Sequence, residues 1–176
     1  MFVNPKRIRV LVEKEKAKGP VVYWMGRDQR ARDNWALLHA KELAEKHDSP
    51  LAVVFCLVPK FLGATSRQYR FMLQGLKEVE RNLRALDIAF FLLQGDPGRE
   101  IPTFLSEQDA SALVCDFSPL RQSRIWKEVV AGKIEIPFFR GRRPQHSAML
   151  AGIAKGRVGC LQLPSQDTSS SARVYG

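Results

Sequence analysis

The 176-residue sequence lacks several features that would place it in a particular protein class. It has no run of about 18 apolar residues, so a membrane-spanning helix is not expected. Its three cysteines, Cys56, Cys115 and Cys160, are too few and too far apart for a disulfide framework or a zinc-binding pattern. Neither the Walker phosphate loop nor the glycine pattern of dinucleotide-binding proteins occurs. The basic N-terminus has no apolar signal core behind it, and we therefore predict a cytoplasmic protein.

Acidic residues are also scarce, since 18 of them stand against 28 lysines and arginines and leave a net charge of +10. Residues 140–176 account for half of this excess, with six basic residues and one acidic residue. The rest of the chain is close to an ordinary balance of charge. The net charge is therefore weak evidence that the folded part binds nucleic acid.

Side chains that carry out catalysis are sparse as well. His39 and His47 lie eight residues apart on one predicted helix, with no carboxylate or cysteine at the spacing of a metal site. No serine stands in a nucleophile motif. We therefore predict neither catalytic residues nor a metal site in this chain.

Apolar runs alternate with amphipathic segments between residues 20 and 139, as in a parallel sheet covered by helices on both faces. Right-handed crossovers join such strands. The sequence thus predicts an α/β fold, a Rossmann-like, doubly wound parallel sheet of five strands. The expected strands are residues 21–25, 51–58, 88–93, 112–115 and 134–138, and the expected helices are about 34–47, from 66 onward, 97–108 and 116–130. Residues 1–19 are predicted to form an N-terminal arm or short helix, and residues 140–176, interrupted by glycines, a disordered tail.

The residues that follow the predicted strands form the candidate site, because ligands of open α/β sheets bind beyond the carboxyl ends of the strands. Arg27 and Arg30, after the first of these strands, are suited to an anionic group. The candidate cofactor-binding residues are Met25, Arg27, Asp28, Arg30, Gly95, Asp96, Asp116, Phe117 and Ser118.

The alternative interpretation gives these residues structural roles. Arg27 would pair with Asp28 or Asp116. Asp33, Asp96 and Ser118 would serve only as helix caps. On this evidence the chain is a Rossmann-like ligand-binding domain without an evident reaction.

Longer motifs carry a resemblance to a known family. They are Asn4-Pro5-Lys6-Arg7, the box Tyr23-Trp24-Met25-x-Arg27-Asp28-Gln29-Arg30-x-x-Asp33-Asn34-Trp35-Ala36-Leu37, Tyr69-Arg70-Phe71-Met72-Leu73-x-Gly75-Leu76, Gly95-Asp96-Pro97 and Asp116-Phe117-Ser118-Pro119-Leu120-Arg121. In this order, over residues 4–138, they resemble the N-terminal α/β domain of class II cyclobutane pyrimidine dimer photolyases. The departures are small, since Gly26, Ala89 and Cys115 stand where that family commonly has Ser, Pro and Thr.

The resemblance implies a domain of an enzyme that splits thymine dimers in damaged DNA by light-driven electron transfer from reduced flavin. In that family the flavin, FAD, and the flipped dimer occupy a large C-terminal helical domain. In some members the N-terminal domain holds a deazaflavin antenna near the carboxyl ends of its strands. No counterpart of the helical domain is recognisable after Phe139. We therefore expect this chain to bind no flavin, to repair no DNA by itself, and to expose the flank that the helical domain would cover.

The residues after Phe139 also offer a reason why the resemblance stops there. The family continues as Glu-Val-Asp-Ala-His-Asn-Ile-Val-Pro-Cys-Trp, and codons permitted for residues 140–151, read one base out of frame, can encode that sequence. Met149 followed by Leu150, for example, gives Cys in the shifted frame. We therefore predict a one-base frameshift near codon 139 or 140, either a mutation or a sequencing error.

Two other interpretations stay open. The chain can be a stand-alone α/β module that binds a chromophore or nucleotide and contacts nucleic-acid phosphates through its basic tail. It can also be a subunit that docks with a separately encoded helical flavin domain. Loss of DNA affinity on removal of the tail would favour the first, and co-purification with a flavoprotein the second.

Overall fold

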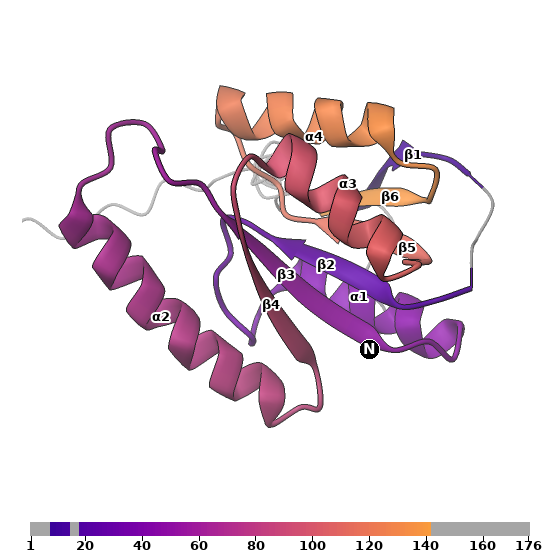
Figure 1. Ribbon diagram of the computed structural model, residues 1–176. Helices are drawn as coiled ribbons and strands as arrows, with labels where there is room; N and C mark the ends of the chain where they lie inside the picture. The colour runs from indigo at the N-terminus through magenta and orange to yellow at the C-terminus, as the bar shows by residue number, and fades with distance from the viewer. Residues whose placement is uncertain (1–7, 15–17, 142–176) are drawn as a thin grey trace, which may run out of the picture. The chain divides into compact units, whose positions relative to one another are not determined.

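The computed structural model describes residues 8–14 and 18–141, which form a six-stranded sheet with helices on both faces (Figure 1). The strands are β1 (Ile8–Val12), β2 (Val21–Met25), β3 (Leu51–Leu57), β4 (Ala89–Gln94), β5 (Ala112–Cys115) and β6 (Phe138–Gly141). The helices are α1 (Trp35–Lys46), α2 (Ser66–Arg84), α3 (Pro97–Glu107) and α4 (Arg121–Lys133). The strand order is β1-β6-β5-β2-β3-β4, and only β1 runs antiparallel to its neighbour. This confirms the predicted Rossmann-like, doubly wound α/β fold.

The sheet has six strands, one more than the five predicted, because part of the expected N-terminal arm pairs with β6. Strand β1 aligns antiparallel to β6, with Ile8 opposite Gly141 and Arg9 opposite Arg140. An edge strand is exposed on one side and therefore carries charged residues. The few apolar residues of this segment gave no strand pattern, and its partner lies far along the chain.

The last strand begins four residues later than predicted. Ile134 caps the C-terminus of α4, and Ile134 and Ile136 both pack into the core without belonging to a strand. The apolar run at 134–138 thus reflects burial more than strand geometry. Arg140 and Gly141, which were predicted to begin the tail, belong to β6. The rest of the predicted tail, residues 142–176, lies outside the described residues.

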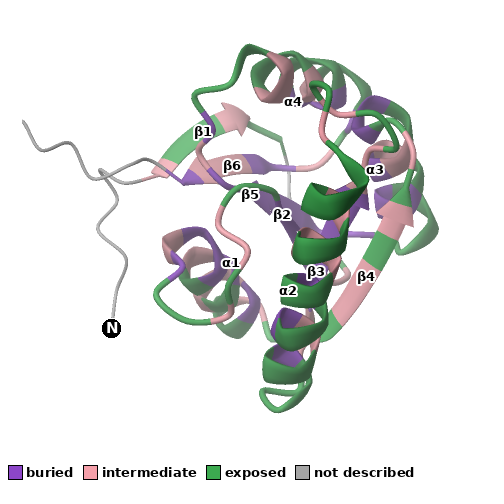
Figure 2. Ribbon diagram, turned by 90° about the vertical axis from the view of Figure 1, so that its left-hand side faces the viewer, coloured by how far each residue is buried: buried purple, intermediate pink, exposed green. Residues whose placement is uncertain are grey.

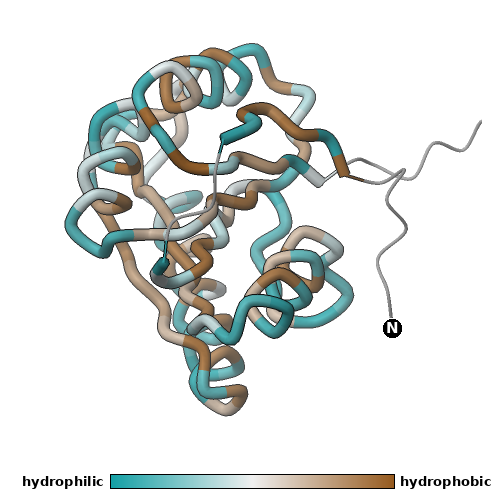
Figure 3. Tube along the Cα trace, turned by 90° about the vertical axis from the view of Figure 1, so that its right-hand side faces the viewer, coloured by the Kyte–Doolittle hydropathy of each residue, from teal (hydrophilic) through white to brown (hydrophobic). Residues whose placement is uncertain are grey.

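The core has two layers, one on each face of the sheet. Strand β2 is buried along its whole length. Tyr23 and its neighbours at alternate positions pack against α1 and α2, whereas Val22 and Trp24 pack with residues of α3 and α4. Figure 2 shows the buried residues along the central strands and the exposed outer face of α2, and Figure 3 shows the same strands as hydrophobic. A strand covered on both faces gives the continuous apolar run seen in the sequence.

Two helices begin differently from the prediction. Asn34, not Asp33, is the N-cap of α1, since its side chain accepts hydrogen bonds from the first turn while Asp33 has a left-handed backbone (φ 51°). Helix α4 begins at Arg121. The segment from Asp116 to Leu120, predicted to open that helix, is instead a loop after β5. Within the part of the chain that the structure describes, no helix is long and apolar enough to cross a membrane.

Candidate functional site

Asp116 joins the end of β5 to the loop that follows β2. Its Oδ2 accepts hydrogen bonds from the backbone N–H groups of Gly26 and Asp28, both at 2.9 Å. Its Oδ1 accepts a hydrogen bond from the Tyr23 hydroxyl. Its backbone oxygen accepts one from Nζ of the buried Lys127. All these contacts position neighbouring segments of this chain.

Asn34 holds the other end of the same loop. Its Nδ2 donates to the Tyr23 hydroxyl oxygen at 2.8 Å and to the backbone oxygen of Asp28 at 2.9 Å. Its Oδ1 accepts from the N–H groups of Ala36 and Leu37, both at 3.1 Å. Asn34 and Asp116 therefore fix the loop between β2 and α1 through a shared contact with Tyr23.

Burial dominates the electrostatics of this network. Removal from water raises the pKa of the Asp116 carboxyl, although the hydrogen bonds from Tyr23 and the two amides lower it. Burial, followed by the negative charge of Asp116, raises the pKa of Tyr23 well above its ordinary value. Tyr23 therefore keeps its proton and acts as a hydrogen-bond donor, not as an acid in a reaction.

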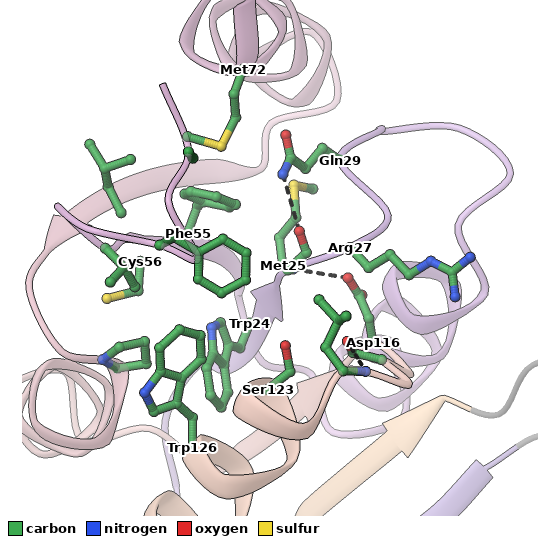
Figure 4. Close-up of a pocket in the computed structure, with 18 of the residues that line it drawn as sticks. Trp24, Met25, Arg27, Gln29, Phe55, Cys56, Met72, Asp116, Ser123 and Trp126 are labelled. Carbon is green, nitrogen blue, oxygen red and sulfur yellow. Dashed lines mark hydrogen bonds between the residues drawn. The ribbon is translucent and has the colours of Figure 1, made fainter. Parts of the chain in front are cut away.

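A cleft of about 480 Å³ opens beside this network, at the carboxyl ends of β2 and β3 (Figure 4). Its walls are mainly apolar and aromatic. Strand β2 contributes Trp24 and Met25, and β3 contributes Phe55 and Cys56. The loop after β3 and the helices α2 and α4 complete it with Phe61, Tyr69, Met72 and Trp126. The rings of Phe61 and Trp126 lie 5.8 Å apart between centroids, tilted by 33°.

Hydrogen bonds hold one wall of the cleft in place. The Tyr69 hydroxyl donates to the backbone oxygen of Val58 at 2.6 Å and accepts from the backbone N–H of Phe61 at 3.0 Å. These bonds tie α2 to the loop after β3. The Tyr69 hydroxyl therefore fixes the backbone of Phe61, whose aromatic ring lines the cleft.

The polar groups of the cleft are few. Ser123, on the first turn of α4, places its hydroxyl among the lining residues, and Gln29 extends along the opposite side (Figure 4). The Gln29 side chain donates to the backbone oxygen of Gly26 at 3.2 Å. Apolar walls with a small number of polar groups are typical of sites for organic ligands.

The residues predicted for the site divide into two groups. Met25, Arg27, Asp116 and Ser118 line the cleft. Asp28, Arg30, Gly95, Asp96 and Phe117 do not line it. The predicted site did not include the aromatic walls, because Tyr69, Met72 and Trp126 lie on helices, where such residues commonly pack in the core. A signal was present in the sequence, since Phe61 follows β3 and Tyr69 lies in the first turn of α2.

The alternative roles predicted for these residues also differ from the structure. Arg27 is exposed, extends away from the aromatic rings in Figure 4, and forms no ion pair with any residue the structure describes. Asp96 occupies the N-cap position of α3 without a side-chain bond to it. Ser118 accepts a weak bond from the N–H of Leu120 at 3.4 Å, ahead of α4. Asp116 holds backbone amides and caps no helix.

The two cysteines of the described chain lie in the interior. Cys56 and Cys115 are both free and buried. Burial raises the pKa of each thiol to about 12, so both are protonated at neutral pH. Within residues 8–14 and 18–141, no three His, Cys, Asp or Glu side chains gather as ligands for a metal ion.

Sequence comparison relates the chain to DNA photolyases. Residues 21–142 match the family model described as DNA photolyase. The chain is 52% identical over 133 residues to a deoxyribodipyrimidine photo-lyase of Arabidopsis thaliana, which covers 73% of this chain and 27% of that protein. It is 43% identical over 140 residues to a deoxyribodipyrimidine photo-lyase of Potorous tridactylus, covering 77% and 26%. The chain therefore spans about a quarter of the length of these curated relatives.

Solved structures share the fold at low sequence identity. A cryptochrome from Synechocystis sp. PCC6803 superposes with a TM-score of 0.56 and 16% identity, covering 65% of this chain and 25% of that chain. A universal stress protein from Archaeoglobus fulgidus superposes with a TM-score of 0.50 and 18% identity, covering 72% and 45%. At these identities the likeness concerns the fold alone.

Proposed function

The chain belongs to the DNA photolyase family, and we propose that its α/β domain is the N-terminal, antenna-type domain of a class II deoxyribodipyrimidine photolyase. The motif order in the sequence and the identity to the photo-lyases of Arabidopsis and Potorous support this proposal. Light-driven repair of pyrimidine dimers would then require a helical flavin domain. Because the chain spans about a quarter of its relatives, we propose that it does not repair DNA alone.

The observation that carries the antenna role is the aromatic cleft at the carboxyl ends of β2 and β3. Its volume, about 480 Å³, falls within the range of small-molecule sites. Trp24, Phe55, Phe61 and Trp126 offer flat apolar surfaces to a planar ring system. The cleft therefore suits a deazaflavin, which when bound would absorb light and pass the energy to a flavin. The fixed loop between β2 and α1 keeps one rim of the cleft in place.

Binding of a deazaflavin to variants tests this function. The full chain is titrated into synthetic 8-hydroxy-5-deazaflavin and binding is followed by fluorescence polarisation. Phe61→Ala removes a ring of the wall and is expected to weaken binding about tenfold, since aromatic stacking adds to the apolar area buried. Phe71→Ala is the matched control, because Phe71 is 81% exposed and does not line the cleft. Equal affinity for both variants, or no binding to the unaltered chain, would contradict the antenna role.

The predicted change of reading frame begins within β6, near codon 139 or 140, and concerns mainly residues 142–176, which lie outside the described part. We propose it on the codon analysis of residues 140–151 and note that the family match ends at residue 142. Resequencing of this stretch tests it. A shifted frame that does not continue as a flavin-domain coding sequence would exclude it.

A further inference from the structure

A second cleft, of about 520 Å³, lies next to the loop between β5 and α4, and its character is different. Three arginines line it, namely Arg9 from β1, Arg140 from β6 and Arg124 from α4. Glu128 and the loop residues Phe117, Ser118 and Pro119 complete the wall. The aromatic cleft is lined mainly by apolar and aromatic side chains, whereas this second cleft is lined by guanidinium groups from three separate elements.

The pairing of β1 with β6 places two of these arginines directly opposite each other. Arg9 and Arg140 are partners in the antiparallel register, so their side chains leave the same face of the sheet. Like charges directly opposite one another in a sheet repel. An anion between the two guanidinium groups would turn this repulsion into a shared attraction.

Arg140 is held in place, yet one of its donors has no acceptor. Its guanidinium lies over the ring of Phe117, 5.8 Å from the ring centroid. Its Nε is buried and has no hydrogen-bond partner among the described residues. A buried N–H of a charged group without an acceptor is uncommon, because such groups are paired in folded proteins. The stacked guanidinium of Arg140 therefore has at least one hydrogen-bond donor whose acceptor is missing among the described residues.

No group in the described chain neutralises the cluster. None of the three arginines forms an ion pair with a described residue, and the only carboxylate in the wall, that of Glu128, is not within ion-pair distance of them. The three guanidinium groups and one carboxylate leave the cleft with two net positive charges. A ligand of matching charge and several oxygen acceptors would satisfy the donors.

We propose that this cleft, in the chain with Arg140 in β6, binds a phosphate group. This proposal takes the sequence as it stands, since a change of reading frame at codon 140 would replace that arginine and remove the site. The planar guanidinium of arginine matches the geometry of phosphate oxygens and can donate two parallel hydrogen bonds. Inorganic phosphate and the phosphodiester of a nucleic-acid strand present the same chemistry, so both are sources to be distinguished. The two clefts adjoin, because Ser118 and Pro119 line both, but none of the three arginines lines the proposed chromophore cleft.

The test measures binding of inorganic phosphate and of a decathymidylate to the full chain by calorimetry, at low and constant ionic strength. Arg124→Gln and Arg140→Gln are expected to weaken binding about tenfold, since each removes a charge-assisted contact. Arg121→Gln is the matched control, because Arg121 is exposed on the same helix and does not line the cleft. Binding of phosphate itself identifies a small-anion site, and binding of the oligonucleotide alone identifies a backbone-phosphate site. Phe61→Ala should leave both affinities unchanged, which separates this proposal from the antenna role.

A second measurement uses the repulsion between the paired arginines. In chloride buffer Arg9→Gln should raise the melting temperature, because it removes the like charge opposite Arg140. In phosphate buffer of the same ionic strength the same variant should gain less stabilisation than the unaltered chain. An equal response of all variants to phosphate and chloride, or an equal loss of affinity in Arg121→Gln and Arg124→Gln, would overturn the proposal.

Discussion

At the scale of single residues, the loop between β2 and α1 depends on one buried carboxylate. Asp116 is 1% exposed and accepts hydrogen bonds from two backbone amides and from the Tyr23 hydroxyl. Of these donors the Tyr23 hydroxyl is buried, whereas the amides of Gly26 and Asp28 are partly buried. The loop that borders the aromatic cleft therefore depends for its position on a side chain that follows β5, distant in sequence.

Removal of that carboxylate should destabilise the fold. Asp116→Ala leaves two amides and a buried hydroxyl without their acceptor, and we expect the free energy of unfolding to fall by about 3 kcal/mol. Urea unfolding followed by circular dichroism measures the change. Glu78→Ala, at an exposed position on α2, should stay within about 0.5 kcal/mol of the unaltered chain. A loss as small as that of the control would mean that the network does not support the fold.

His39 gives the fold a dependence on pH. Its ring meets the edge of Phe139, with centroids 5.6 Å apart, and its Nε2 is buried without a partner among the described residues. Burial lowers the pKa of His39 below its ordinary value, although the charge of Glu42 raises it. The unfolded chain therefore takes up the proton first. Stability should be complete above about pH 6.5 and fall as the pH drops from there to the folded pKa.

His39→Leu tests this dependence. The variant should lose the part of the stability change that lies between about pH 7.5 and pH 5, because Leu does not bind a proton there. Urea midpoints measured at several pH values, for the variant and the unaltered chain, provide the comparison. Parallel curves for the two proteins would show that His39 is not the group responsible.

At the scale of elements, α2 combines a row of buried apolar residues with a side-chain N-cap. Leu76, Val79 and Leu83 are its buried residues, while most of its other residues are exposed. Thr65 precedes it as N-cap in a capping box with Gln68. The cap lies next to the loop that carries Phe61 into the aromatic cleft. The start of α2 therefore matters for the wall of the cleft as well as for the helix.

Thr65→Ala should cost about 1 kcal/mol of stability, since the N–H of Gln68 loses its acceptor. Ser66→Ala is the matched control, because Ser66 is the first residue of the helix and makes no capping bond. Thermal unfolding of the two variants measures the difference. If the Ser66 variant were less stable than the Thr65 variant, the assignment of Thr65 as the N-cap would be wrong.

At the scale of the whole molecule, several large apolar side chains face solvent. Phe71 is 81% exposed and Leu62 is 71% exposed, and Leu86 and Leu92 are also exposed. Exposed apolar surface of this kind often marks an interface with a partner.

The chain should associate as its concentration rises, because burying Phe71 and Leu62 against another copy removes apolar surface from water. Phe71→Lys should shift the distribution toward monomer in gel filtration with light scattering. Leu38→Lys, a substitution at a less exposed apolar residue on α1, should change it less. A monomer at high concentration would argue that no partner domain is missing and would favour the stand-alone module.

Much of the fold follows from the sequence alone. The predicted limits of β2 and β5 agree with the structure, because a strand buried on both faces has an uninterrupted apolar sequence. The family motifs likewise predicted the relation to photolyases. These signals are local, since each depends on residues that are adjacent or one helical turn apart.

Only the tertiary structure decided the rest. The pairing of β1 with β6, the role of Asp116, and the gathering of Phe61 and Trp126 in one cleft all join segments far apart in the chain. No local pattern encodes such contacts, because a loop aromatic or a buried carboxylate has the same sequence signature whether it binds a ligand or supports the fold. The physical reason is that burial and hydrogen-bond partners are set by three-dimensional packing, whereas periodicity reports only on which face of an element is apolar.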